Sequence, residues 1–194
     1  MGISEEKSSL RTRYRRERNE RYIEHSFEYL ATSPEFLKAE TIASYISYGD
    51  EPNTEQLNRA LIKAGKTLLL PRISGEDLEW VQWNGDDGAL QQKKKLREPT
   101  GVAITSLSNI NVIVVPALRI DRSGYRLGQG GGYYDRALVH LSAWSIGLIH
   151  PDEISGTNLP REPWDIPLHA AATPDLMLRF NACLLYTSPS PRDS

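Results

Sequence analysis

Residues 124–136 read GYRLGQGGGYYDR and follow closely on NVIVVPAL at 111–118, the most apolar strand-like run of the chain. Such a run predicts a buried, central strand of a parallel sheet. A glycine-rich loop after a strand can bring backbone N–H groups around an anion, and the first turn of a following helix, expected at about 133–142, points its free N–H groups to the same place. The order of strand, loop and helix therefore predicts a phosphate site at the carboxyl edge of a sheet.

Two charged side chains of this loop support the prediction. Arg126 offers a forked guanidinium that suits phosphate oxygens, and Asp135 could hold a magnesium ion together with substrate phosphates. The loop is not a Walker motif, because no Gly-Lys-Ser or Gly-Lys-Thr ends it, and it meets the dinucleotide pattern GxGxxG only loosely. A flexible turn with Tyr133 and Tyr134 packed in the core is the alternative interpretation.

The chain before the loop has the pattern of a βαβ unit. TIASYIS at 41–47 is short, apolar and β-branched, which predicts a buried strand. Thr54 then caps a predicted helix that ends at Gly65. KTLLLPRI at 66–73 predicts a second buried strand, stopped by Pro71. Two strands joined through a helix by short connections imply a parallel sheet.

Three other segments have strand patterns. LEWVQW at 78–83 alternates apolar and polar residues, as an edge or hairpin strand does, while the segments 144–149 and 169–173 read as further buried strands. The alternation of strands and helices predicts one α/β domain, a three-layer α/β/α fold with a mostly parallel central sheet and a charged amino-terminal helix. We expect this domain to span residues 1–180.

The charged amino-terminal helix is predicted over residues 5–31, with one face formed by Leu10, Tyr14, Phe27 and Leu30. Six arginines lie between Arg11 and Arg21, which would suit an RNA-binding arm. Over residues 5–28, however, seven basic side chains accompany six glutamates, so the segment is nearly neutral and predicts a solvated, ion-paired face.

Composition narrows the functional classes. The 194 residues are 39% hydrophobic and 25% charged, a balance typical of a globular protein. A formal net charge of −2 and the absence of an 18-residue apolar run argue against nucleic-acid and membrane partners. Cys183 is the single cysteine, so no disulfide framework forms within the chain, and we expect a cytoplasmic protein. We also expect it to be a monomer. The Ser/Pro-containing tail at 181–194 predicts disorder and looks like translated vector sequence.

RLGQGGGYYDR resembles the hallmark RLGxGxGYYD of the 5-formyltetrahydrofolate cyclo-ligase family, also called methenyltetrahydrofolate synthetases. Further family features occur in the right order over residues 7–175. They are Lys7-x-x-Leu10-Arg11, Glu51-x-x-Thr54, Pro71-Arg72, WDIPL at 164–168 and Thr173-Pro174. The resemblance implies ATP-dependent conversion of 5-formyltetrahydrofolate to 5,10-methenyltetrahydrofolate, with ATP as co-substrate and Mg²⁺ as cofactor.

The resemblance also implies roles for individual residues. Catalytic roles fall to Glu51, Arg126 and Asp135. The implied ATP contacts are Lys7, Arg11, Arg126, Leu127, Gly128, Gln129, Gly130, Gly131, Gly132, Tyr133 and Tyr134. The implied folate contacts are Ile46, Glu51, Gln129, Gly130, Gly131, Gly132 and Tyr133. The implied magnesium ligands are Asp135 and Asp165, with a turn cap before Pro167 as the alternative role of Asp165.

One position departs from the family pattern. Many members carry lysine where this chain has Gly131, so the missing cation would have to come from Lys7, Arg11, Arg126 or the metal. Two other classes stay open on the residues alone. One is a phosphate-ester-binding isomerase or an acyl-transferring enzyme of similar fold, and the other is a non-catalytic nucleotide- or RNA-binding protein. Solvated or packing roles are expected for Trp80, Trp83 and the three lysines at 93–95, and no role for His140, His150 and His169.

Overall fold

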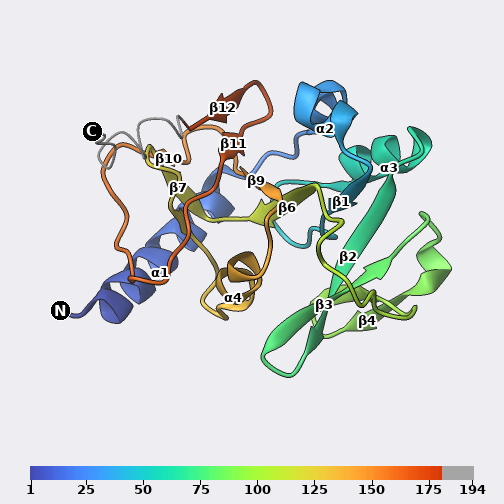
Figure 1. Cartoon of the computed structure of the whole chain (residues 1–194). Helices are drawn as coiled ribbons and strands as arrows, with labels where there is room; N and C mark the ends of the chain where they lie inside the picture. The colour runs from blue at the N-terminus through green and yellow to red at the C-terminus, as the bar shows by residue number, and fades with distance from the viewer. Residues whose placement is uncertain (181–194) are drawn as a thin grey trace, which may run out of the picture.

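A computed structural model describes residues 1–180, and the predicted tail at 181–194 lies outside the described residues. Its centre is a seven-stranded sheet in the order β12-β11-β9-β6-β1-β2-β3 (Figure 1). All neighbouring pairs are parallel except β2–β3 and β11–β12 at the two edges. The strands are β1 Thr41–Ala43, β2 Thr67–Ser74, β3 Asp77–Gln82, β6 Val112–Pro116, β9 Trp144–Leu148, β11 Ala170–Ala172 and β12 Met177–Arg179. The predicted α/β class with a mostly parallel sheet is confirmed.

Strand β6 has the central place that its apolar sequence predicts. It lies between β1 and β9, and its residues from Val112 to Val115 are buried. Its parallel pairing with β9 sets Val112 opposite Trp144 and Pro116 opposite Leu148. A strand covered on both faces needs apolar residues at every position rather than at alternate ones, which explains the continuous run.

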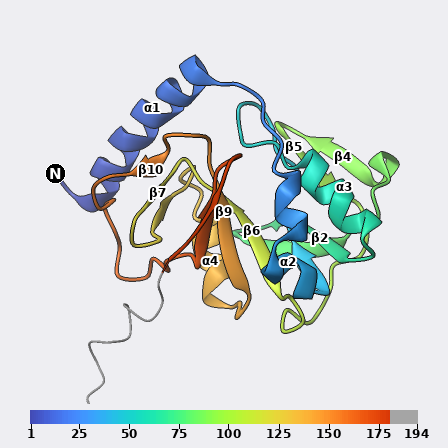
Figure 2. The same ribbon diagram turned by 90° about the horizontal axis from the view of Figure 1, so that it is seen from above.

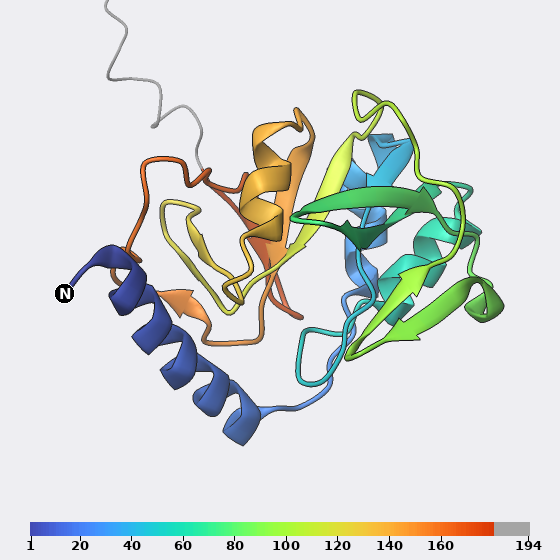
Figure 3. The same cartoon turned by 90° about the horizontal axis from the view of Figure 1, so that it is seen from below.

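Helices cover both faces of the sheet (Figures 1 and 3). On one face lie η1 Glu28–Thr32, α2 Pro34–Lys38 and α3 Glu55–Lys63, which bury Phe27, Leu30, Phe36, Leu57 and Leu61 against β1, β2 and β6. On the other face lies α4 Tyr133–Val139, whose Leu138 joins a second buried cluster with Ala43, Leu69 and Ile113. Neighbouring strand residues thus serve opposite clusters, as the pleat requires.

Two small sheets extend the main one. The first, in the order β10-β7-β8, consists of β10 Ile154–Ser155, β7 Arg119–Asp121 and β8 Arg126–Leu127, and α1 lies beside it (Figure 2). The second is the hairpin of β4 Leu90–Lys93 and β5 Leu96–Pro99, preceded by η2 Asp87–Ala89. The hairpin has no counterpart in the predicted elements, because its QQKKKL sequence is exposed and lacks an apolar alternation.

The amino-terminal helix is shorter than predicted. Helix α1 spans Ile3–Arg21 and ends where Tyr22 takes an extended conformation, so the prediction of one helix over 5–31 is wrong. Tyr14 packs with Leu118, Leu127 and Leu159, whereas Phe27 belongs to the main core. The chain leaves the helix because these two groups of apolar side chains are buried in different places. No helix of residues 1–180 is long and apolar enough to cross a membrane.

Two local predictions also need correction. Strand β2 continues through Pro71 to Ser74, because β1 pairs only with Thr67–Leu69 and leaves the later residues of β2 without a partner on that side. A proline that lacks an N–H is tolerated at such an edge. Strand β1 ends at Ala43 rather than at residue 47, and the chain from 44 to 53 runs as a loop.

Candidate active site

A cavity of about 250 Å³ opens at the carboxyl ends of β1, β2 and β6. Its walls come from the glycine loop, from the 44–53 loop and from hairpin β4–β5. Most of the predicted site residues line it, namely Arg11, Ile46, Glu51, Arg126, Gly128, Gln129, Gly130, Gly131, Gly132, Tyr133, Tyr134 and Asp135. Lys7, Leu127 and Asp165 do not line it. The cavity lies where open α/β sheets bind their ligands.

The glycine loop has the backbone of an anion cradle. Gly130 and Gly132 have positive φ angles of 106° and 74°, which glycine adopts without strain. Within residues 1–180, the N–H groups of Gln129, Gly130 and Gly131 donate no hydrogen bond to a protein acceptor. These N–H groups are therefore available to an anionic ligand. Helix α4 has only seven residues, so the loop and its neighbouring cations must provide most of the attraction for phosphate.

Helix α1 holds this loop from outside. Arg11 donates through Nε to the Gly128 carbonyl at 2.8 Å, while Arg15 donates to the side chain and the carbonyl of Gln129 at 2.8 and 2.7 Å. Burial, followed by repulsion from Arg15, lowers the pKa of the Arg11 guanidinium. Arg15 was not among the predicted site residues, although its spacing of four from Arg11 on one helix places both on the same face.

Arg126 and Asp135 form the charged floor of the cavity. Arg126 donates to the Pro116 carbonyl at 2.9 Å and to the Asp135 carboxylate at 3.2 Å, and its guanidinium lies 5.7 Å from the ring centroid of Tyr134. The Arg126 side chain is 5% exposed and that of Asp135 is 34% exposed. The carboxylate thus faces the cavity, while the arginine fixes its direction from below.

Asp135 fits a magnesium ion better than Asp165 does. The Asp135 carboxylate lines the cavity next to the unpaired N–H groups of the glycine loop. Asp165 instead accepts from the Lys7 ammonium at 2.7 Å and from the Glu162 N–H at 2.8 Å, outside the cavity lining. Residues 1–180 contain no group of three or more His, Cys, Asp and Glu side chains suited to a metal. A magnesium ion at Asp135 would therefore share its coordination with substrate phosphates, which is its usual mode.

Glu51, in the 44–53 loop, provides an unusual acid in the wall of the cavity. The residue is 8% exposed, and its carboxylate accepts the Tyr48 N–H at 3.0 Å. Burial is the largest cause that raises the pKa of Glu51 from 4.5 to about 7, against the opposing effects of the Tyr48 hydrogen bond and the Arg18 charge. Ile46 forms an apolar part of the same wall. A pKa raised towards neutrality favours the protonated form of this carboxyl group, which donates as well as accepts hydrogen bonds.

Other cavity residues were missed from the sequence. Tyr45 is buried, and its hydroxyl has no hydrogen-bond partner in the described part of the chain. Burial, followed by the nearby Glu51 charge, raises the pKa of Tyr45. Ile73 and Arg97 contribute from β2 and β5. Only the folding of distant segments brings these side chains together, so no local motif indicates them.

The residues expected to have packing or solvated roles can also be placed. Trp80 is buried, with its ring 6.4 Å from that of Tyr134 in an edge-on arrangement, and Trp83 is buried beside α3. The lysines at 93–95 lie exposed on the β4–β5 hairpin. These placements agree with the packing and solvated roles expected from the sequence.

The model of the 5-formyltetrahydrofolate cyclo-ligase family matches residues 3–174. The 5-formyltetrahydrofolate cyclo-ligase of Escherichia coli strain K12 is 33% identical over 153 residues, which cover 75% of this chain and 84% of that protein. The cyclo-ligase of Mycolicibacterium smegmatis is 34% identical over 149 residues, which cover 71% and 75%.

Solved structures show the same likeness. The NMR structure of Aquifex aeolicus 5,10-methenyltetrahydrofolate synthetase matches with a TM-score of 0.75 and 28% identity, over 90% of this chain and 93% of that one. The synthetase from Mycoplasma pneumoniae matches with a TM-score of 0.60 over 85% and 96%. At 18% identity, this second match supports the fold alone.

Proposed function

The chain belongs to the 5-formyltetrahydrofolate cyclo-ligase family, ATP-dependent ligases of folate one-carbon metabolism, and we propose that the cavity between the glycine loop and Glu51 is its active site. The proposed reaction converts 5-formyltetrahydrofolate and ATP to 5,10-methenyltetrahydrofolate, ADP and phosphate. The observation that carries this proposal is the shared cavity itself. Its glycine loop offers unpaired N–H groups for phosphate, and its 44–53 loop offers a buried acid and apolar side chains for a pterin.

We propose that the nucleotide phosphates lie on the glycine loop. Arg11 and Arg15 hold the loop in place through Gly128 and Gln129, and Arg126 is the buried cation nearest to Asp135. A Mg²⁺ ion held by Asp135 and the phosphates would supply charge neutralisation there. Lys7 is proposed to act indirectly, because its ammonium is bound to Asp165. The loop has no side chain at Gly131, so Arg11, Arg126 and the metal ion would together provide the positive charge.

We propose that 5-formyltetrahydrofolate binds against Ile46, Tyr45 and Glu51. The Glu51 carboxyl, whose pKa is raised by burial, can donate as well as accept hydrogen bonds and so matches the edge of a pterin, which presents both donors and acceptors. The unpaired Tyr45 hydroxyl would find a polar substrate atom as its partner. The formyl oxygen then faces the γ-phosphate across the narrow cavity.

The chemical step follows from this placement. The formyl oxygen attacks the γ-phosphorus, and the bond from that phosphorus to ADP breaks, leaving an imidate phosphate. Folate N10 then attacks the formyl carbon, the carbon–oxygen bond breaks, and phosphate departs while the N10 proton is released. Phosphoryl transfer of this kind requires positioning and charge neutralisation more than a protein nucleophile. The cavity provides cations and N–H groups, in agreement with this requirement.

An absorbance assay tests the proposal. Purified protein is mixed with 5-formyltetrahydrofolate and Mg²⁺, and formation of the methenyl product is followed with and without ATP. We expect product only with ATP, and greatly reduced product with Asp135→Ala. Asp175→Ala, which changes an exposed aspartate outside the cavity, is the matched control and should retain full activity. Full activity of Asp135→Ala would refute the role of that carboxylate, and ATP-independent product would refute the reaction.

A further inference from the structure

The turn at residues 48–51 carries the folate-side acid of the cavity but has few bonds to the rest of the protein. Tyr48 and Glu51 bind each other through two hydrogen bonds, Tyr48 N–H to the Glu51 carboxylate at 3.0 Å and Glu51 N–H to the Tyr48 carbonyl at 3.2 Å. Gly49 has a φ of 60°, and no strand or helix includes these residues. The position of Glu51 therefore depends on contacts that reach the turn from outside it.

One side chain from a distant segment makes such a contact. His150 follows β9 in the sequence, and its Nε2 lies 2.7 Å from the Asp50 carbonyl, immediately before Glu51. Among residues 1–180, no other side chain from outside the turn forms a hydrogen bond with it. A carbonyl oxygen only accepts, so the Nε2 of His150 carries the hydrogen. The residue is 8% exposed, and burial is the main cause that lowers the pKa of His150, which favours the neutral ring.

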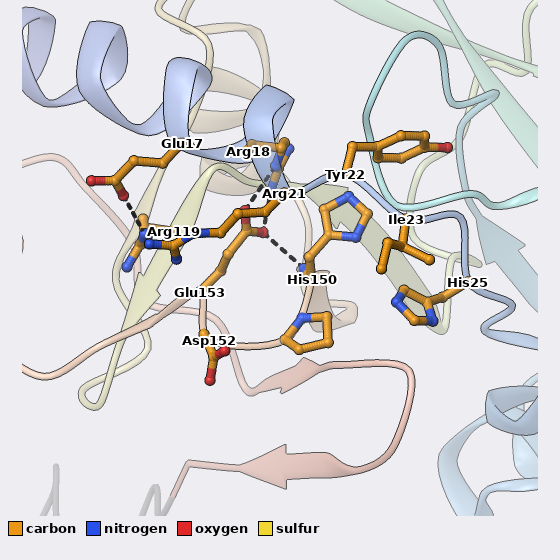
Figure 4. A pocket seen from close by; sticks show the side chains of 11 residues that line it. Glu17, Arg18, Arg21, Tyr22, Ile23, His25, Arg119, His150, Asp152 and Glu153 are labelled. Carbon is orange, nitrogen blue, oxygen red and sulfur yellow. Dashed lines mark hydrogen bonds and ion pairs between the residues drawn. The ribbon is translucent and has the colours of Figure 1, made fainter.

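The histidine is itself fixed by a buried ion pair (Figure 4). The Glu153 carboxylate accepts the His150 backbone N–H at 2.8 Å and binds Arg18 of α1 through two hydrogen bonds, at 2.6 and 3.0 Å. Arg18 also donates to the Ala117 carbonyl, just after β6, at 2.7 Å. The side chains of Arg18 and Glu153 are 2% and 9% exposed. Hydrogen bonds, joined through the His150 residue itself, therefore connect α1 and the end of β6 to the turn at 48–51.

The same residues border a hollow of about 160 Å³, which could suggest a ligand site (Figure 4). Its least exposed charges are already paired within the protein, while Arg21 and Asp152 at its border are exposed. Arg18 binds Glu153, and Arg119 binds Glu17 at 2.9 Å. A charged ligand that used any of these four paired groups would have to break an ion pair, so the arrangement favours a structural link over a second binding site.

We infer that His150, held by Glu153 and Arg18, is a positioning residue that keeps Glu51 directed into the folate part of the active site. The inference rests on the proposed function of Glu51. Without the bond to Asp50, the turn would adopt several conformations, and only some of them would present the carboxyl group to the folate. The ATP side would be unaffected, because Arg11 and Arg15 hold the glycine loop through separate hydrogen bonds.

Three variants test this role. His150→Phe keeps a flat ring without the donor, and His150→Gln keeps an N–H at a similar reach. His25→Phe is the matched control, because its ring lies in the same hollow at 6.5 Å from His150 but forms no hydrogen bond with residues 48–51. We expect His150→Phe to raise the KM for 5-formyltetrahydrofolate about tenfold, the effect of one lost hydrogen bond of about 1.4 kcal/mol, while the KM for ATP stays unchanged. His150→Gln should restore most of the affinity, and His25→Phe should match the wild type.

Hydrogen exchange without substrate supplies a second measurement. We expect faster exchange at the amides of residues 48–51 in His150→Phe, and wild-type exchange in His150→Gln and His25→Phe. The inference is overturned if His150→Phe leaves both the folate KM and this exchange unchanged, or if it raises the KM for ATP and folate equally. If the wild type showed no ATP-dependent activity, the proposed function would fail, while exchange would still decide whether His150 fixes the turn.

Discussion

Replacement of Glu51 by glutamine should make the protein more stable at alkaline pH while impairing its reaction. In the folded protein, burial raises the pKa of Glu51 to about 7, whereas in the unfolded chain the group returns to about 4.5. Ionisation of Glu51 therefore costs more free energy in the folded protein than in the unfolded chain. Stability associated with the protonated group is fully present below pH 4.5 and is lost as the pH rises through 7. Glutamine is neutral throughout and can still accept the Tyr48 N–H.

The size of the effect follows from the pKa difference. A rise from 4.5 to about 7 corresponds to about 3 kcal/mol at pH 8, since each pKa unit represents about 1.4 kcal/mol. Between pH 4 and pH 8, the free energy of unfolding of Glu51→Gln should therefore rise by about 3 kcal/mol relative to that of the wild type. The same variant should lose turnover with 5-formyltetrahydrofolate but retain its affinity for ATP, because Glu51 belongs to the 44–53 loop and forms no hydrogen bond with the glycine loop.

Urea unfolding, followed by tryptophan fluorescence at several pH values, measures this difference. Glu76→Gln is the matched control, because Glu76 is exposed and lies outside the cavity lining, so its difference from the wild type should stay flat. If the difference in the free energy of unfolding between Glu51→Gln and the wild type did not change with pH, the raised pKa of the buried Glu51 would be refuted. Normal folate kinetics in this variant would refute its role in the site.

Three further substitutions have expected outcomes. Asp135→Asn should lower kcat/KM about a hundredfold, since a metal's charge stabilisation is worth several kcal/mol. Steady-state kinetics over a range of Mg²⁺ concentrations will show whether excess metal restores part of the lost kcat/KM. Lys7→Met leaves Asp165 without its partner at 2.7 Å and should lower the free energy of unfolding by about 2 kcal/mol in urea, with wild-type stability as the contrary result. Gly132→Ala places a side chain on a residue with a φ of 74°, with its Cβ 2.5 Å from the Arg136 Nη1. It should lower the free energy of unfolding by about 1–2 kcal/mol and raise the KM for ATP. Unchanged stability and ATP kinetics would count against the strained loop.

The main sheet was largely predictable because its signals are local. The apolar run of β6 marks a strand buried on both faces, and the alternation in β3 marks an edge strand. The β4–β5 hairpin escaped prediction because its QQKKKL sequence is polar. The end of α1 at Arg21 also escaped, because it depends on where Phe27 is buried rather than on a capping residue.

The candidate site likewise contains residues that the sequence predicted and residues that it did not. The glycine loop with Arg126 and Asp135 is contiguous, so its sequence alone predicted a phosphate site, and the family resemblance added Glu51 from a separate segment. Tyr45 escaped prediction, because its relation to the cavity exists only after distant segments pack together, whereas Arg15 escaped although it lies one turn from Arg11 on the same helix face. The same holds for the contact between His150 and Asp50, which are a hundred positions apart.

Oxygen-isotope transfer tests the central claim most directly, namely that the cavity brings the formyl oxygen against the γ-phosphate of ATP. The protein is supplied with ATP, Mg²⁺ and 5-formyltetrahydrofolate labelled with oxygen-18 in the formyl group, and the released phosphate is analysed by mass spectrometry. We expect one labelled oxygen in the phosphate for each methenyltetrahydrofolate formed. Unlabelled phosphate, with the label in water instead, would contradict phosphorylation of the formyl oxygen in this cavity.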